Sequence, residues 1–469
     1  MSLPAAGVAT RWLDQCERLS TTRQVWLLVG LSFLLLVLAM PVPLMRGMLY
    51  AEEGTTYLRY AREATALRAF LAPHQGYFSL LPNSLALIAT RLLPVRYMPL
   101  LFAWGALCVH LLVVWAAATC ERFTSFRTRA VAAGVALLAA GTARTLESTI
   151  NSQYFFGVAA VLVLLSSPAR HRVARSLLLA MGSLTGLYVC FMAPAFLWKA
   201  IARRTLAAWW QALLVGALTL VQLVTVLRAI PYSTRSLPQQ NLTVYIGSLF
   251  TNEVLLSFGS RILYRPLTLF IVRSGSALMY AVVALLAILA WGFLFRLVRK
   301  PGRLPVLLLC LALYLAACAS IGIMGGPADV LGDGDRYHVV SNACLALAVL
   351  LAALRLPAGS RRLRICRVLV CLVLFSGFFD LARQWRSNSY DPAWAPQVLA
   401  WQANPELPLT TAPLHWKEHK VLLAPKPLEM EIPFYLYDSN LRASVRERLP
   451  ADCFATHRNA LAPGHCTPR

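Results

Sequence analysis

The stretch VWLLVGLSFLLLVLAMPVPL, Val25–Leu44, decides the fold class of this chain. It carries no charged side chain, and about 20 apolar residues in a helix span the hydrocarbon core of a bilayer. No small-residue cleavage site ends the run, so we expect a retained transmembrane helix and not a signal peptide. Arg11, Arg18 and Arg23 precede it, which predicts a cytoplasmic N-terminus under the positive-inside rule.

Apolar runs of this kind recur along the whole chain, which is 58% hydrophobic and 14% charged over 469 residues. A soluble domain is nearer half apolar and a quarter charged. The composition therefore excludes an ordinary cytosolic enzyme, a disordered chain and a secreted disulfide scaffold. It predicts an all-α polytopic membrane protein with a bundle of about 10–12 transmembrane helices.

The expected spans lie near residues 25–45, 98–120, 130–143, 153–168, 206–228, 275–297, 304–324, 337–355 and 366–382. Helix breakers and flanking basic clusters predict a broken helical hairpin at 177–197, which enters and leaves on the cytoplasmic side. The stretch 77–93 is apolar but interrupted by Pro82, Asn83 and Arg91. We expect it to be a helix lying on the outer face of the membrane.

The formal net charge of +24 is not gathered in one basic patch, so nucleic acid is not an expected partner. The basic residues recur instead as short clusters between apolar runs, which is typical of cytoplasmic loops. These clusters lie at 122–129, 170–175, 199–204, 296–303 and 355–367. The outer side then holds the loops 46–97, 144–152, 229–274 and 325–336 together with the C-terminal tail.

The chain is expected to have two parts. Residues 1–382 form the membrane domain, and residues 383–469 form a small extracytoplasmic domain or tail, because the long apolar runs end there. Only Cys453 and Cys466, of eleven cysteines, fall in this tail. An oxidising compartment would allow them to pair, and two free thiols are the alternative.

Acidic residues are scarce in the membrane domain and lie mainly on the expected outer side. The segment YAEEGTTY, Tyr50–Tyr57, follows the first span and contains Glu52 and Glu53. A carboxylate pair there can act as general base on a hydroxyl, and the proximity of the two groups should raise one pKa. The alternative is a solvated helix N-terminus, where the helix dipole favours negative charge. A transporter would instead place ionisable groups at the membrane midplane, so their position favours a surface active site.

Two further outer segments carry candidate binding residues. His74 and Gln75, within APHQGYF, could bind sugar hydroxyls or phosphate, or could belong to an ordinary surface turn. Glu147, Asn151 and Tyr154 recur at i, i+4 and i+7, so one helical face could carry all three. Polar residues at the end of a span are also often only interfacial.

The last outer loop reads GGPADVLGDGDRYH, residues 325–338. Its glycines allow tight turns and close backbone approach to a ligand. Arg336 lies at the mouth of the next span, where a guanidinium can hold a phosphate through two hydrogen bonds. The aspartate spacing is not that of a calcium loop. An ordinary turn with an interfacial arginine is the alternative.

Taken together, residues 25–382 resemble the GT-C superfamily of integral-membrane glycosyltransferases. In that superfamily an acidic motif follows the first transmembrane helix, in a long outer loop with juxtamembrane helices. Glu52-Glu53 and residues 56–93 look like these features, and the broken run 184–194 looks like the short helix pair found mid-chain. The segments NSQY (151–154) and DRY (335–337) look like motifs of bacterial members.

The resemblance implies a glycosyltransferase of the bacterial inner membrane with a periplasmic active site. It would be a hexosyl- or pentosyltransferase that moves a sugar from a polyprenyl-phosphate carrier to a hydroxyl of a glycan, lipid or protein. Glu52 or Glu53 would be the base, and Arg336 with Arg235 or Arg265 would stabilise the leaving phosphate. The remaining candidates for substrate binding are His74, Gln75, Glu147, Asn151, Gln153, Asp335 and Tyr337.

This scheme requires no metal or other cofactor, because arginine can stabilise the negative charge of the phosphate. A divalent cation at the acidic loop is the alternative. Two other classes share the apolar bulk of the chain: a transporter or flippase of lipid-linked sugars, and a structural subunit in which the outer carboxylates are dispensable.

Overall fold

The computed structural model describes residues 5–142, 145–146, 148–230, 240–323, 326–387, 394–411 and 420–430. The chain is about 78% helical. In the described ranges the only sheet is a pair of two-residue antiparallel strands, β1 (Leu409–Thr410) and β2 (Lys420–Val421). The expected all-α class is confirmed.

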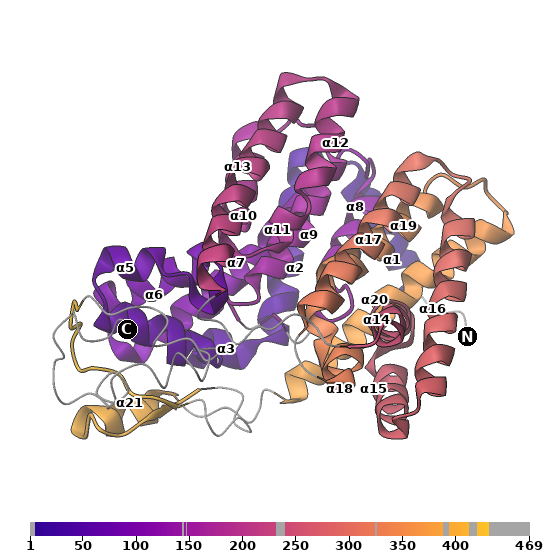
Figure 1. Ribbon diagram of the computed structural model, residues 1–469. Helices are drawn as coiled ribbons and strands as arrows, with labels where there is room; N and C mark the ends of the chain where they lie inside the picture. The colour runs from indigo at the N-terminus through magenta and orange to yellow at the C-terminus, as the bar shows by residue number, and fades with distance from the viewer. Residues whose placement is uncertain are drawn as a thin grey trace.

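The helices follow one another from α1 to α21 (Figure 1). The first group is α1 (Ala5–Glu17), α2 (Thr21–Ala39), α3 (Pro41–Arg46), η1 (Glu53–Leu58), α4 (Arg59–Glu63), α5 (Ala66–Leu71), η2 (His74–Gly76), α6 (Leu80–Leu92), η3 (Val95–Tyr97), α7 (Met98–Ala118), α8 (Phe126–Leu137) and α9 (Ser152–Leu165). The second is α10 (Arg172–Thr185), α11 (Tyr188–Phe191), α12 (Ala193–Arg203), α13 (Leu206–Ala229), α14 (Leu242–Ser248), η5 (Leu249–Leu255), α15 (Leu256–Ser274), α16 (Ala277–Val298), α17 (Arg303–Gly322), α18 (Pro327–Leu331), η6 (Asp333–His338), α19 (Val339–Ala353), α20 (Arg361–Ser387) and α21 (Trp394–Ala403).

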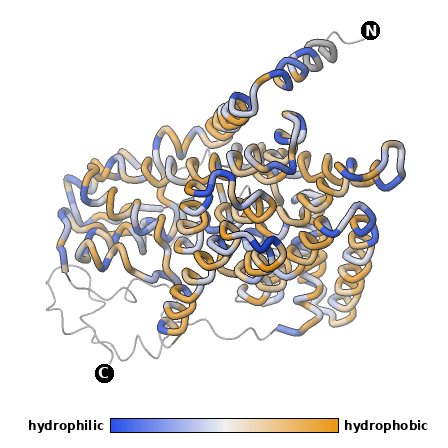
Figure 2. The backbone as a smooth tube through the Cα atoms, turned by 90° about the horizontal axis from the view of Figure 1, so that it is seen from above, coloured by the Kyte–Doolittle hydropathy of each residue, from blue (hydrophilic) through white to orange (hydrophobic). Residues whose placement is uncertain are grey.

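Eight helical segments of the described ranges are long and apolar enough to cross a membrane, which confirms a multi-pass membrane protein. They are Thr21–Ala39, Val95–Ala118, Leu206–Ala229, Leu242–Ser274, Ala277–Val298, Arg303–Gly322, Gly334–Ala353 and Arg361–Arg383. Figure 2 shows hydrophobic residues along most of the helices. The helices α9 and α19 carry apolar side chains around their circumference, and other helices pack against them. They are therefore buried almost throughout.

Some expected spans differ from the observed helices. The runs 130–143 and 153–168 overlap α8 and α9, which have 12 and 14 residues and are shorter than the eight long segments. Residues 242–274, expected within an outer loop, form instead an apolar helical segment of spanning length. Ser260 interrupts this segment with a φ of 52°, a backbone conformation that costs energy for a residue with a Cβ.

The run 177–197 is broken as expected. Helix α10 ends at Thr185 and Gly186 follows it, then comes the four-residue α11, and α12 has Pro194 in its first turn. A Cβ on Gly186 would lie 2.4 Å from Oε1 of Gln153 in α9, so a side chain there would collide with α9. The break therefore lets the chain approach α9 closely.

The loop 46–97 and the described part of the tail share one hydrophobic core. Tyr57, Phe102, Trp394 and Val421 belong to it, and Nε1 of Trp394 donates a hydrogen bond of 3.0 Å to the carbonyl of Val95. Figure 1 shows α5, α6 and α21 at the end of the molecule opposite the turn between α12 and α13. Residues 394–411 and 420–430 thus pack on the loop 46–97 and do not build a core of their own.

Candidate active site

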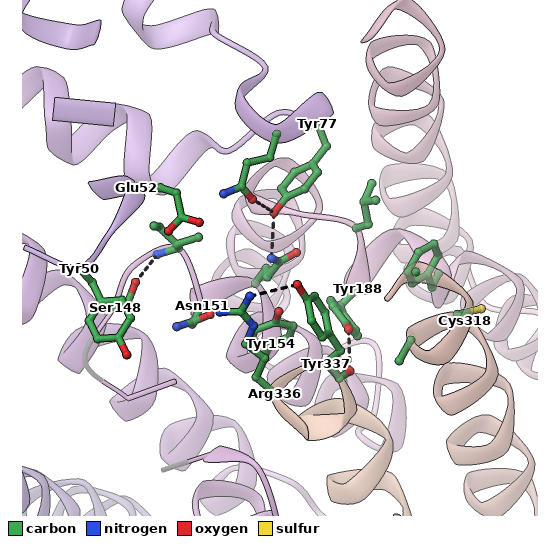
Figure 3. A pocket seen from close by; sticks show the side chains of 17 residues that line it. Tyr50, Glu52, Tyr77, Ser148, Asn151, Tyr154, Tyr188, Cys318, Arg336 and Tyr337 are labelled. Carbon is green, nitrogen blue, oxygen red and sulfur yellow. Dashed lines mark hydrogen bonds between the residues drawn. The ribbon is translucent and has the colours of Figure 1, made fainter. Parts of the chain in front are cut away.

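A cavity of about 120 Å³ brings together four parts of the chain: the loop 46–97, the beginning of α9, the break after α10, and η6 with the neighbouring end of α17. Six of the side chains expected at the site line it, and several of them are labelled in Figure 3. They are Glu52, Gln75, Asn151, Gln153, Arg336 and Tyr337.

Glu52 and Arg336 border this cavity from segments nearly three hundred residues apart in the sequence (Figure 3). Glu52 directly precedes η1, and Arg336 lies within η6. The guanidinium of Arg336 lies over the ring of Tyr337, 5.1 Å from the centroid, and donates a hydrogen bond of 3.2 Å to its Oη. Glu52 and Arg336 interact electrostatically. The cavity therefore joins a potential proton acceptor to a positioned cation.

A chain of hydrogen bonds fixes one polar wall of the cavity. Nε2 of Gln153 donates to Oη of Tyr77 at 3.0 Å, and this hydroxyl donates to Oε1 of Gln75 at 3.1 Å. The two amides come from α9 and from η2, so the tyrosine links these segments. Amide groups held in this way are suited to hydrogen-bonding the hydroxyls of a small polar ligand.

Aromatic rings form another part of the cavity wall. Tyr154 packs edge to face against Tyr188 and Tyr337, with centroid distances of 5.0 and 6.1 Å. Oη of Tyr188 donates a hydrogen bond of 2.6 Å to the backbone carbonyl of Tyr337, which ties the helix break to η6. Ring faces beside amides and charged groups give one apolar side and one hydrogen-bonding side to the same ligand.

Glu53 does not line this cavity, although it adjoins Glu52. It is fully buried, and its Oε1 accepts hydrogen bonds from the backbone N–H of Thr149 (2.6 Å), from Oγ1 of Thr149 (2.7 Å) and from Oγ of Ser148 (3.2 Å). Its Oε2 accepts one from the backbone N–H of Tyr50 at 2.9 Å. Glu53 therefore ties the loop 46–97 to the segment that precedes α9, and it positions Ser148 at the cavity.

We expect Glu53→Gln to lower the free energy of unfolding by about 1–3 kcal/mol, because the amide NH₂ replaces an acceptor where donors converge. Burial raises the pKa of the Glu53 carboxyl from 4.5 to about 7. The folded protein then binds this proton more tightly than the unfolded chain, so this contribution to stability falls as the pH rises from about 4.5 to 7. The Gln variant should lose that pH dependence. Thermal unfolding of both proteins in detergent between these pH values measures it, and parallel curves would contradict the assignment.

The remaining predicted site residues lie elsewhere. His74 is buried with its ring edge against Tyr57 and Tyr60, at 4.7 and 5.2 Å, and burial lowers its pKa to about 3, so it is neutral at pH 7. Arg265 and Asp335 line a separate cavity. Three expected features fall outside the described residues: Glu147, Arg235 and the pair Cys453 and Cys466.

A second cluster of polar side chains is buried where the end of η6 packs against η5. Nδ1 of His338 is 2.6 Å from Oε1 of Glu253, and Oγ of Ser341 donates to the same oxygen at 2.5 Å. Glu253 and His338 are completely buried. Because His338 is only two residues from Arg336, this cluster holds the end of η6 against η5. We predicted from the sequence that Glu253 lies in an outer loop. The structure instead places it within the apolar segment Leu242–Ser274.

Tyr50, Tyr77 and Tyr188 line the cavity but were not singled out from the sequence. Tyr188 follows the helix break at Gly186, and Tyr77 follows Gln75 by two residues. Their only sequence signal is an aromatic residue beside a helix breaker or a polar motif. Such tyrosines are also common at membrane interfaces, so the pattern does not separate the two roles.

No protein-family model, curated protein or solved structure matches this chain. Within the described residues, no group of three or more His, Cys, Asp or Glu side chains is placed to hold a metal ion. The chemistry must therefore be argued from the cavity itself.

Proposed function

We propose that this protein is a membrane glycosyltransferase that moves a sugar from a polyprenyl-phosphate carrier to a hydroxyl acceptor, with a GT-C-like arrangement and an active site on the periplasmic side of a bacterial inner membrane. The observation that carries the proposal is the cavity that Glu52 and Arg336 share. Its amides and aromatic rings suit a sugar, and the surrounding apolar helices suit a lipid carrier.

In the proposed reaction, Glu52 accepts the proton of the acceptor hydroxyl. The hydroxyl oxygen forms a bond to the anomeric carbon, the bond from that carbon to the carrier phosphate breaks, and the phosphate leaves with the electron pair. Arg336 stabilises the negative charge that develops on this phosphate. Gln75, Asn151 and Gln153 hold sugar and acceptor hydroxyls against the tyrosine wall.

The base role falls to Glu52 and not to Glu53, because only Glu52 lines the cavity. Both oxygens of Glu53 already accept hydrogen bonds from the protein. Arg336 carries the phosphate role alone among the predicted arginines that the structure describes, since Arg265 borders a different cavity. The scheme needs no metal, and a chelator that abolishes transfer would argue for a divalent cation.

A transporter or flippase of lipid-linked sugars is a second candidate, favoured by one observation. Glu253 and His338 form a buried ionisable pair within helices long enough to span the membrane. Ionisable residues inside membrane segments frequently mark ion or proton pathways. This pair also packs beside η6, so it serves equally well to position Arg336.

Reconstituted proteoliposomes separate the two functions. Radiolabelled sugar on a polyprenyl-phosphate carrier is added together with candidate acceptors. A transferase releases free polyprenyl phosphate and labels the acceptor. A transporter moves the intact labelled lipid to the opposite leaflet, and intact movement without release would overturn the proposal.

A further inference from the structure

A second polar cavity, of about 180 Å³, lies between α15, α18, η6 and the end of α20. Three arginines border it, Arg261, Arg265 and Arg383, together with a single acidic residue, Asp335. Figure 1 shows α15 and α18 together at the end of the molecule away from the turn between α12 and α13. The lining therefore has more positive than negative side chains.

One of the three arginines is already neutralised. Nη2 of Arg261 lies 2.5 Å from Oδ2 of Asp335, and its Nε lies 4.0 Å from Oδ2 of Asp380. Both aspartates are buried, with 1% and 4% of their surfaces exposed. This cluster forms a fixed inner wall and accounts for the acidic residue of the lining.

The other two arginines are available to a ligand. Arg265 and Arg383 are exposed, and the guanidinium of neither makes a hydrogen bond or an ion pair with any residue in the part of the chain that the structure describes. They come from α15 and α20 and border the same cavity. The nearby aspartates, Asp335 and Asp380, are both engaged by Arg261, and Asp380 also interacts electrostatically with Arg383, so the three arginines outnumber the two carboxylates. Two guanidinium groups in this arrangement suit an anion with several oxygens, such as a phosphate.

The surroundings of the cavity are apolar on one side. Leu269 and Val272 continue its wall along α15, and Ile262, Leu263 and Phe270 of the same helix are 49%, 58% and 60% exposed. Because α15 belongs to an apolar segment of spanning length, these exposed side chains suit contact with hydrocarbon chains. A ligand with an anionic head and hydrocarbon chains satisfies both parts of the site, whereas a free anion satisfies only the arginines.

We propose that this cavity binds the phosphate of an anionic membrane lipid, with Arg265 and Arg383 on the phosphate and α15 along the chains. The site is separate from the Glu52 cavity, because the consecutive residues Asp335 and Arg336 of η6 line different cavities. The proposal does not depend on the transferase function. It would hold equally for a transporter.

Native mass spectrometry of the full-length, delipidated protein tests the site. The protein is titrated with phosphatidylglycerol and, separately, with zwitterionic phosphatidylcholine. We expect the anionic lipid to bind about tenfold more tightly, and the double variant Arg265→Gln with Arg383→Gln to lose this preference. The corresponding lysine double variant should recover part of it, because lysine keeps the charge but not the two-pronged hydrogen bonding.

A matched control removes the same charge elsewhere. Arg228 and Arg273 are exposed near helix ends and border none of the cavities described above, so their Gln double variant should keep the lipid preference. If both double variants weakened the preference for the anionic lipid equally, the preference would depend on the overall charge of the protein and not on this cavity. That result would overturn the proposal. Displacement of the lipid by inorganic phosphate alone would assign the cavity to a free anion, and would also overturn it.

Discussion

Glu52→Gln is expected to lower the rate of sugar transfer by about 10²–10⁴-fold, the range that a positioned general base contributes. The amide has the same size as the carboxyl but cannot accept the acceptor's proton. Glu52 borders the cavity and holds no structural hydrogen bond through its side chain in the described residues, so expression and thermal stability should stay near the wild-type values. Transfer of radiolabelled sugar in proteoliposomes measures the rate.

The neighbouring carboxylate supplies the control for this experiment. Glu53→Gln changes the same chemical group one residue further on, at a buried position where it accepts four hydrogen bonds. Its activity loss should follow its loss of folded protein and should shrink when the rate is expressed per folded molecule. Full transfer by the Glu52→Gln protein would show that Glu52 is not the base.

Arg336→Gln is expected to lower transfer by about 10²–10³-fold, because the developing charge of the leaving phosphate loses its cation. The effect should fall mainly on kcat if Arg336 acts on the transition state, and on KM if it only binds the donor. Arg336→Lys should recover part of the rate, since an ammonium keeps the charge but cannot form the two-pronged contact. Steady-state assays at varied donor concentration separate these cases.

A matched substitution tests whether the effect is local. Arg273→Gln removes one positive charge from the last turn of α15 and borders neither polar cavity. Its transfer rate should stay within about twofold of the wild type, because exposed charges at this range are largely screened. Comparable losses in the two variants would mean that overall charge matters, and that Arg336 has no special role at the cavity.

Much of the architecture could be predicted from the sequence, because hydropathy reports directly on the solvent around a helix. Val25–Leu44 indicated the membrane class, and the breakers at Gly186 and Pro194 indicated the interrupted run that α10, α11 and α12 form. The segment Leu242–Ser274 was missed. Asn252, Glu253 and three arginines lower its mean hydropathy. The fold buries Asn252 and Glu253, and it places Arg261 and Arg265 at a cavity.

The sequence alone determined that a polytopic helical protein places a carboxylate pair, two glutamines and an arginine in segments that flank its apolar runs. Only the tertiary structure decided which of them meet. Glu52 and Glu53, like Asp335 and Arg336, are neighbours in the chain but lie in different surroundings, because consecutive side chains leave the backbone in different directions. The surroundings of each side chain depend on the segment that packs against it. For Glu53, this segment is the one that contains Ser148 and Thr149. Hydropathy and spacing carry no information about such distant partners, so the division into a cavity residue and a buried anchor belongs to the fold.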